Sequence, residues 1–390
     1  MSRIPQAHNH LEMATRTIFF TLAVAVRTRK VLMVDPTGTE AVVAQPLSTY
    51  ILPGRITEPA VGLQEAVDAE QAGFSRVWIS ERYDLKELGV LSGAVAARTS
   101  RIGVASGLAA LPARHPLLLA AYAATMQATF GERLLLGVGG GFTPLLAPHG
   151  MQVMNKAAIA DYVGILRRLW RGETVSYAGP AGTYPNMKMA DPLQVAPPPI
   201  VYGAFGGPKA MDLVARHFDG VMFMPFLAVE VVADALRMLR ETLERIGRDP
   251  ASVWSCHTVV TAPNMTDAEV LAVVHARALT YLQVPGYGDT MLARNGWDPA
   301  ELEALRQHPV FRGMRAEAAD QEFHRSQLVE AAKRLPDAWM TSTCAIGTPD
   351  ECAAKLAEYF ALGVDEICLH GASPAQTAPV VEAWRRRRRP

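Results

Sequence analysis

The sequence has few cysteines and none of the common metal-binding motifs. Only four cysteines occur in 390 residues, and no two of them form a Cys-x-x-Cys pair. Scattered thiols of this kind argue against a zinc ribbon or a disulfide scaffold, and they indicate reduced cysteines in a cytoplasmic protein. No His-Glu-x-x-His motif is present, and the ten histidines lie mostly far apart. The sequence therefore gives no support for a metal site.

Neither sign of charge is in excess. The chain has 38 lysines and arginines against 38 aspartates and glutamates, so its formal net charge is zero. A general positive field that would attract nucleic acid or an anionic membrane is therefore missing. We expect a small-molecule partner instead, with no nucleic acid and no membrane.

Long apolar runs are also scarce. The one segment that resembles a targeting signal is the nine-residue run 18–26 between Arg16 and Arg27, which is about half the length of a bilayer-crossing helix. Its basic-then-apolar order is also found in signal peptides, so secretion stays an alternative. We interpret residues 1–46 as an irregular extension and residues 47–390 as one domain. The arginines at 385–389 are interpreted as a solvated tail, with anion binding as the alternative.

Short apolar runs recur along the rest of the chain and predict eight strands. They span residues 48–52, 76–80, 102–106, 134–138, 199–203, 220–223, 253–260 and 366–369. Helix signals lie between them: Thr57 and Pro59 predict one helix start and Gly73 its end, while His115 precedes a helix that Gly131 ends. Strands that alternate with helices indicate parallel βαβ units, and eight of them predict a (β/α)8 TIM barrel. Long insertions after strand 4 (142–198) and strand 7 (281–340) would shape or cover the substrate mouth.

Charged residues appear where the second strand ends. Active sites of such barrels are built at the ends of the strands, which makes Glu81, Arg82 and Tyr83 candidate catalytic residues. Arg82 cannot act as an ordinary base because its guanidinium stays protonated, but it can clamp an anionic substrate or polarise a carbonyl. The alternative is that Glu81 and Arg82 only pair with neighbouring loops.

Two glycine clusters follow later strands. The first, at 137–141, does not match the G-x-G-x-x-G dinucleotide fingerprint, because the sixth position is Phe142 or Pro144. Its backbone could instead lie against a cofactor ring or ribityl chain, or simply form a tight turn. In the second cluster, Gly206 and Gly207 precede Pro208 and Lys209. Proline suits the first turn of a helix, and a helix N-terminus favours an anion, so this cluster predicts a phosphate site.

The order and spacing of several segments resemble a known family. They are ISER at 79–82, RIGVASG at 101–107, HP at 115–116 with AATM at 123–126, RLLLGVG at 133–139, DYV at 161–163 with LWRG at 169–172, GGPK at 206–209 and AIGTP at 345–349. Together they resemble the bacterial-luciferase-like superfamily of flavin and deazaflavin oxidoreductases, in particular its coenzyme F-420-dependent branch. The resemblance extends from about Tyr50 to the end of the last helix.

The resemblance implies roles for individual residues. Glu81 would lie beside the flavin ring, and Glu81 and Tyr83 are the candidates for ring contact or proton delivery. Ser106-Gly107 would form a non-proline cis bond or bulge behind the deazaflavin, with Ala109 on the same loop. The remaining cofactor contacts would come from Gly140 and Gly141 to the cofactor's side chain, and from Gly206, Gly207, Lys209 and Ala210 as its phosphate loop. The resemblance also implies a homodimer.

Two departures bear on the substrate. Sugar-phosphate dehydrogenases of this family carry Asp-His where this chain has Glu81-Arg82, and an acid where it has Phe142. Their substrate is therefore not expected here. Three functions remain: an F-420-dependent oxidoreductase that transfers a hydride, an FMN-dependent monooxygenase served by a separate reductase, and a flavin-binding protein without turnover.

Overall fold

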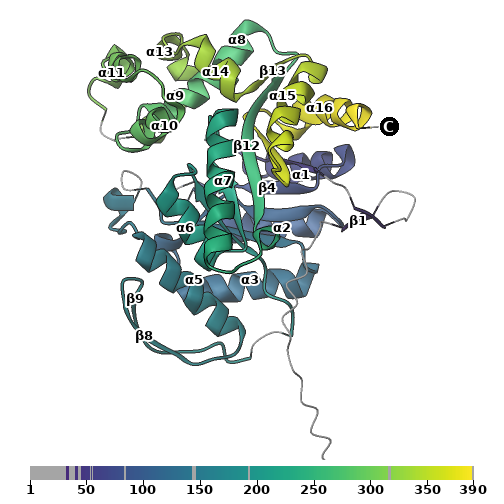
Figure 1. Cartoon of the computed structure of the whole chain (residues 1–390), viewed down its shortest axis with the longest axis vertical. Coiled ribbons are helices and arrows are strands. Elements are labelled where there is room, and N and C mark those ends of the chain that lie inside the picture. Colours follow the sequence, from purple (N-terminus) through teal and green to yellow (C-terminus); the bar gives the residue numbers. More distant parts are fainter. Residues whose placement is uncertain are drawn as a thin grey trace, which may run out of the picture.

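The structure is a computed structural model of the whole chain (Figure 1). It describes residues 32–34, 40–42, 45–52, 54, 56–82, 85–142, 146–191, 194–314 and 318–388. Tyr83, the apolar run 18–26 and Arg389 lie outside these residues, so the predictions made for them stay predictions.

Eight parallel strands close into a barrel. They are β3 (Leu47–Tyr50), β4 (Arg76–Ile79), β5 (Gly103–Ser106), β7 (Leu134–Gly139), β10 (Ile200–Ala204), β11 (Gly220–Phe223), β12 (Trp254–Pro263) and β14 (Glu366–His370). Each pairs with the next, and the ring closes because β14 pairs with β3 and β7 pairs with β10. The predicted TIM barrel is confirmed, and each predicted strand overlaps an observed one.

A layer of buried side chains lies inside the barrel. Each of the eight strands contributes one buried residue to it: Tyr50, Trp78, Ala105, Leu135, Val201, Met222, Cys256 and Cys368. Small side chains such as Ala105 and the two cysteines leave room for the rings of Tyr50 and Trp78, so the layer fills without a pore. All four cysteines of the chain are buried and unpaired, in agreement with reduced thiols.

Eight helices cover the outside of the barrel. They are α1 (Val61–Ala72), α2 (Leu88–Arg98), α3 (Pro116–Phe130), α5 (Lys156–Trp170), α6 (Pro208–His217), α7 (Val229–Arg245), α15 (Pro349–Ala361) and α16 (Pro374–Arg387). The predicted signals at Gly73, His115 and Gly131 are confirmed. The predicted start at Thr57 is wrong, because the chain first makes a turn closed by the bond from the Val61 N–H to the Glu58 carbonyl, and α1 begins at Val61.

The insertion after β12 forms a separate layer. It contains α8 (Asp267–Val270), the π-helix η4 (Leu271–His275), α9 (Ala276–Leu282), α10 (Tyr287–Asn295), α11 (Pro299–Arg306), η5 (Pro309–Phe311), α12 (Ala319–Glu322), η6 (Arg325–Leu328), α13 (Val329–Ala332), α14 (Asp337–Thr343) and β13 (Ala345–Gly347). These elements have a hydrophobic cluster of their own, which includes Phe226 and Val260 of the barrel side. Figure 1 shows them in green at the end of the barrel to which β12 runs. The insertion therefore covers the carboxyl ends of the strands.

The other connections are shorter. After β7 come η2 (Ala147–His149), α5 and a hairpin of β8 (Val175–Gly179) and β9 (Gly182–Met187), which was not predicted and lies far from the green insertion in Figure 1. The strand β6 (Ala109–Ala110) pairs with β7 and leads into η1 (Leu111–Ala113), and η3 (Pro250–Ser252) precedes β12.

The ends of the chain are more ordered than the sequence predicted. Within the predicted extension, β1 (Leu32–Val34) and β2 (Glu40–Val42) pair antiparallel. At the other end, residues 385–387 belong to α16 and do not form a separate tail, and Arg386 pairs with Asp350 at 3.1 Å. Among the described residues, no helix is both long and apolar enough to cross a membrane.

The inner layer gives a prediction for stability. Trp78 donates from Nε1 to Ser48 Oγ at 3.0 Å, and both residues are fully buried. The Ser48→Ala substitution leaves this indole N–H without an acceptor, which should lower the free energy of unfolding by about 1–3 kcal/mol in urea titrations. The control is Ser176→Ala, which removes an exposed hydroxyl bonded to Pro185 O. An equal loss in both variants would contradict the assigned role of Ser48.

Candidate active site

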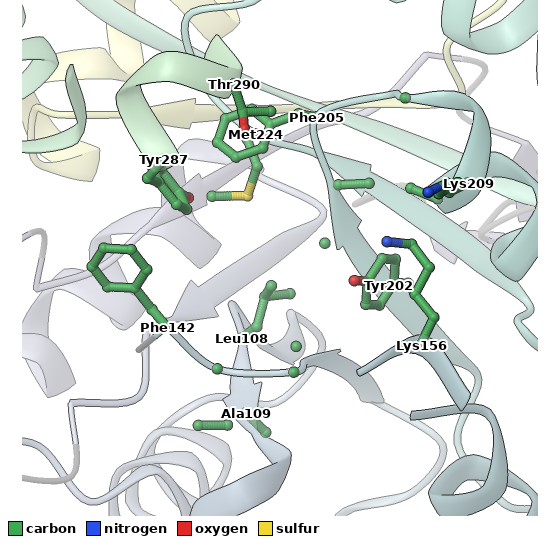
Figure 2. A pocket seen from close by; sticks show the side chains of 18 of the residues that line it. Leu108, Ala109, Phe142, Lys156, Tyr202, Phe205, Lys209, Met224, Tyr287 and Thr290 are labelled. Carbon is green, nitrogen blue, oxygen red and sulfur yellow. The ribbon is translucent and has the colours of Figure 1, made fainter. Parts of the chain in front are cut away.

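A cavity of about 560 Å³ lies at the carboxyl ends of β5, β7, β10 and β11. Its two sides differ in character, as Figure 2 shows. Lys156 and Lys209 lie on one side, while Phe142 and Tyr287 lie on the other. Tyr287 belongs to α10, so the insertion after β12 supplies part of the wall. The cavity therefore has a basic side and an aromatic side.

The back of the cavity is formed by Leu108. The peptide bond between Gly107 and Leu108 is cis, one residue later than the predicted Ser106-Gly107 bond. A Cβ at Gly203 would lie 2.1 Å from Leu108 Cδ1, and one at Gly137 would lie 3.0 Å from Leu108 Cδ2. Glycine is needed at 203 because Leu108 fills the space of a side chain, and at 137 because the Ser106 carbonyl oxygen would lie 2.1 Å from a Cβ.

Two of the three residues predicted for the third-strand loop lie outside the cavity lining. Ser106 is fully buried and donates to the Gly137 carbonyl at 2.7 Å, so it joins neighbouring strands and does not line the cavity. Gly107 also lies outside the lining, and its carbonyl accepts from the Tyr50 hydroxyl at 2.9 Å. Ala109 does line the cavity, as predicted.

Gly140 and Gly141 line the cavity where β7 ends. A Cβ at Gly140 would meet Met154 O and Ile159 Cδ1 at 2.7 Å, and Gly141 has a φ of +83° that favours glycine. The backbone is thus exposed toward the cavity because neighbouring chain leaves no space for side chains. This agrees with the interpretation of the cluster as a surface on which a cofactor can lie.

The basic side of the cavity includes a helix N-terminus. Gly207 is the N-cap of α6, and Pro208, Lys209 and Ala210 form its first turn, all of them on the lining. No other residue lies within 4 Å of a Cβ built on Gly207, so this end is open toward a ligand. The positive end of the helix dipole and the Lys209 side chain favour an anion there. Gly206 faces away from the lining, and its carbonyl accepts from Arg294 at 3.1 Å.

The aromatic side was not predicted. The rings of Phe142 and Phe205 both make edge contacts with Tyr287, at centroid distances of 5.2 Å and 4.7 Å. Met224, at the end of β11, also lines this region. No local sequence pattern indicates Tyr287, because its position depends on how the long insertion folds back over the barrel.

Glu81 lines the cavity but is fully engaged by its neighbours. Its carboxylate accepts from the Ala110 N–H at 2.7 Å and from Arg114 Nε at 2.7 Å, and Arg114 also reaches Glu87. The side chain of Glu81 is only 3% exposed. Burial lowers the pKa of Arg114, but the carboxylates of Glu81 and Glu87 outweigh burial and raise this pKa. Glu81 thus fixes β6, which forms the back of the cavity, to the end of β4.

Arg82 is placed outside the cavity lining. Its Nη1 donates to Asp320 of α12 at 2.9 Å, so it ties the end of β4 to the insertion. Both Glu81 and Arg82 therefore have the loop partners that the alternative interpretation predicted. Among the described residues, no three His, Cys, Asp or Glu side chains are arranged to hold a metal.

A closed β/α barrel whose cavity lies at the carboxyl ends of its strands is the form of a TIM-barrel enzyme. Residues 45–366 match the model of the luciferase-like monooxygenase family. The chain belongs to this family, and the expectation of a luciferase-like oxidoreductase is confirmed.

Relatives of this chain include reductases and dehydrogenases. The 5,10-methylenetetrahydromethanopterin reductase of Methanolobus tindarius is 26% identical over 309 residues, which cover 77% of this chain and 86% of the relative. An F-420-dependent glucose-6-phosphate dehydrogenase of Nakamurella multipartita is 32% identical over 197 residues, which cover 47% of this chain and 58% of the relative.

Solved structures show the same fold. The coenzyme F-420 dependent tetrahydromethanopterin reductase of Methanopyrus kandleri has a TM-score of 0.70 at 19% identity, covering 87% of this chain and 98% of that one. The oxygenating constituent of 3,6-diketocamphane monooxygenase of Pseudomonas putida, in complex with FMN, has a TM-score of 0.60 at 19% identity, covering 87% and 97%.

The Glu81 network gives a second prediction. The Glu81→Gln substitution removes the buried charge that compensates Arg114, so the free energy of unfolding should fall by about 2–4 kcal/mol. Glu87 contacts the same Arg114 but is 54% exposed, and Glu87→Gln should cost only about 0–1 kcal/mol. Urea unfolding of both variants measures the difference. Equal losses of unfolding free energy in the two variants would show that burial does not decide how much each Arg114 ion pair stabilises the fold.

Proposed function

We propose that this protein is an F-420-dependent oxidoreductase that transfers a hydride between the deazaflavin and a small organic substrate. The observation that supports this most directly is the two-sided cavity, in which a helix N-terminus with two lysines faces an aromatic wall. The basic side suits a cofactor's anionic chain, and the aromatic side suits its flat ring. F-420-dependent enzymes among the relatives add to this support.

Each part of the cavity has a role in this proposal. Lys209 and the first turn of α6 would hold the cofactor phosphate, and Lys156 adds a second positive charge. Gly140 and Gly141 let the cofactor chain lie against bare backbone. Leu108 and Ala109 would support one face of the ring. A bound deazaflavin supplies the hydride, while the protein orients the substrate against its free face.

The aromatic residues would keep water from the reacting atoms. Phe142, Phe205 and Tyr287 present apolar surface where the ring face would lie open. Excluding water strengthens electrostatic interactions in the site and prevents side reactions. Because Phe142 replaces the acid of the sugar-phosphate dehydrogenases, and Glu81 is held by Arg114, the proton donor of this reaction would differ from theirs.

An FMN-dependent monooxygenase is the second candidate. It is favoured by the likeness of the fold to a monooxygenase in complex with FMN. FMN also has a phosphate and a flat ring, so the same cavity would accept it. A reduced flavin can react with oxygen, whereas a reduced deazaflavin has carbon in place of N5 and passes a hydride. This candidate needs a separate reductase to supply reduced flavin.

Fluorescence-quenching titrations of the purified protein with F-420 and with FMN separate these functions. We expect tight binding of F-420 and much weaker binding of FMN. The reverse preference would overturn the proposal in favour of the monooxygenase. If neither cofactor binds, the interpretation of the cavity itself is wrong. If F-420 binds but no carbonyl, alkene or alcohol is turned over, a flavin-binding protein without turnover becomes the better description.

The phosphate site gives a third prediction. The Lys209→Met substitution removes one charge at the N-terminus of α6 and should weaken binding of the preferred cofactor about tenfold. The control is Lys188→Met, because Lys188 is exposed and lies outside the cavity lining. The same titration measures both variants. Unchanged affinity of the Lys209 variant would place the phosphate elsewhere.

A further inference from the structure

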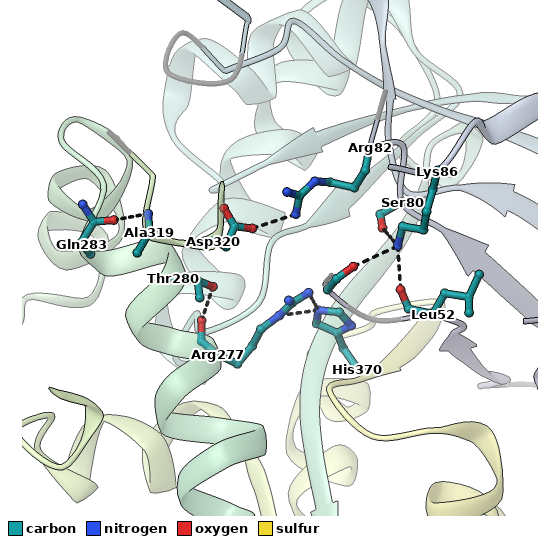
Figure 3. Close-up of polar contacts among 11 residues, drawn as sticks. Leu52, Ser80, Arg82, Lys86, Arg277, Thr280, Gln283, Ala319, Asp320 and His370 are labelled. Atoms are coloured by element: carbon teal, nitrogen blue, oxygen red, sulfur yellow. Dashed lines mark hydrogen bonds and ion pairs between the residues drawn. The ribbon is translucent and has the colours of Figure 1, made fainter. Parts of the chain in front are cut away.

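A second group of polar side chains lies at the barrel mouth beside the cavity, at the ends of β14, β3 and β4 (Figure 3). Lys86 is at its centre and is only 1% exposed. Its Nζ donates to the carbonyls of Leu52 at 2.6 Å and Gly54 at 3.3 Å and to Ser80 Oγ at 3.0 Å. All three acceptors are neutral, so the charge of this buried ammonium has no contact with a carboxylate among the described residues.

Arg277 of α9 approaches the same place. Its Nε and Nη2 lie 3.1 Å and 2.6 Å from Nε2 of His370, at the end of β14. Since Nε2 faces two donors, the ring is neutral with its proton on Nδ1, and Nδ1 has no hydrogen-bond partner although His370 is only 2% exposed. A Cβ at Gly54 would lie 3.2 Å from Arg277 Nη1, which places this guanidinium next to the Lys86 site.

Arg325 completes the group. Its Nη1 donates to the Gly371 carbonyl at 3.0 Å, another neutral acceptor. Nearby carboxylates are already used: Asp320 binds Arg82, and Glu65 accepts from the Leu52 N–H at 2.6 Å. Within the described part of the chain, Lys86, Arg277 and Arg325 thus converge without a carboxylate in contact. Burying cations without a counter-ion is costly, so this arrangement is expected where an anion binds.

The group is connected to the cavity through two tyrosines. The Arg277 guanidinium lies 5.5 Å from the centre of the Tyr281 ring, and the Tyr281 and Tyr287 rings are 5.8 Å apart. Tyr287 lines the cavity. Arg277 is thus two aromatic rings away from the cavity lining, and a substrate that uses both sites would extend from the cavity past these rings.

We propose that Arg277 and Arg325 form a subsite for an anionic group of the substrate, a carboxylate or a phosphate, and that the buried Lys86 adds positive charge beside it. The substrate class is then an organic anion with an apolar body that fits against Phe142, Phe205 and Tyr287. The anion subsite is argued from these side chains alone, and only the statement that the anion belongs to a substrate rests on the proposed function.

The protonation of Lys86 would respond to the anion. Burial first, and then Arg277 and Arg82, lower the pKa of Lys86 to about 7, while Glu65 acts in the opposite direction. Below that pKa the free protein already carries the ammonium, and above it the neutral amine of Lys86 must take up a proton when the anion arrives. Affinity for the anion should therefore fall as the pH rises past 7.

The test is isothermal titration calorimetry of the full chain with two probes, sodium benzoate and inorganic phosphate. We expect at least one probe to bind, with about tenfold weaker binding in Arg325→Met, because one charge-assisted contact is lost. Arg277→Met should have the same effect, which covers the case in which the first variant does not fold. The matched control is Arg240→Met, since Arg240 is an exposed arginine of α7.

The outcomes also separate this subsite from the cofactor site. Weakening by Lys209→Met but not by Arg325→Met would place the anion at the N-terminus of α6 and overturn the proposal, as would the absence of binding of either probe. Benzoate stays ionised near neutral pH, so its loss of affinity above pH 7 should disappear in Lys86→Met. Cofactor titrations of Arg325→Met should match those of the unmodified protein, so a failure of cofactor binding counts against the proposed function alone.

Discussion

The closed barrel is the constraint on which the rest of the structure depends. One side chain from each of the eight strands joins a buried layer inside it, and the large rings of Tyr50 and Trp78 fit there because Ala105, Cys256 and Cys368 are small. Closure fixes where each strand ends, and the functional groups all begin at those ends. Residues as far apart as Glu81, Lys209 and His370 are thereby held at one mouth.

The mouth is divided into two parts by what each strand end carries. The ends of β7 and β10 carry glycines, which make room for Leu108 and expose backbone toward the cavity. The ends of β14, β3 and β4 carry polar and basic groups that surround Lys86. The insertion after β12 serves both parts, because α10 supplies Tyr287 to the cavity and α9 supplies Arg277 to the basic group.

Charge and burial set the roles of the acidic and basic residues. Glu81 lines the cavity, yet two donors on Arg114 and the Ala110 N–H occupy its carboxylate. Its pairing makes it a positioning residue for the strand behind the cavity. Lys86, Arg277 and Arg325 show the opposite case, because within the described part of the chain their hydrogen bonds go to neutral oxygen and nitrogen acceptors.

The sequence by itself determined the barrel, the helix ends at Gly73 and Gly131, and the glycine surface with the N-terminus of α6, because these depend on local periodicity and turn chemistry. The tertiary structure decided the partners of Glu81 and Arg82, the position of the cis bond at Gly107-Leu108, and the placement of Tyr287 and Arg277. Such contacts join residues distant in the chain, and no local pattern encodes which of them meet when the insertion folds over the barrel.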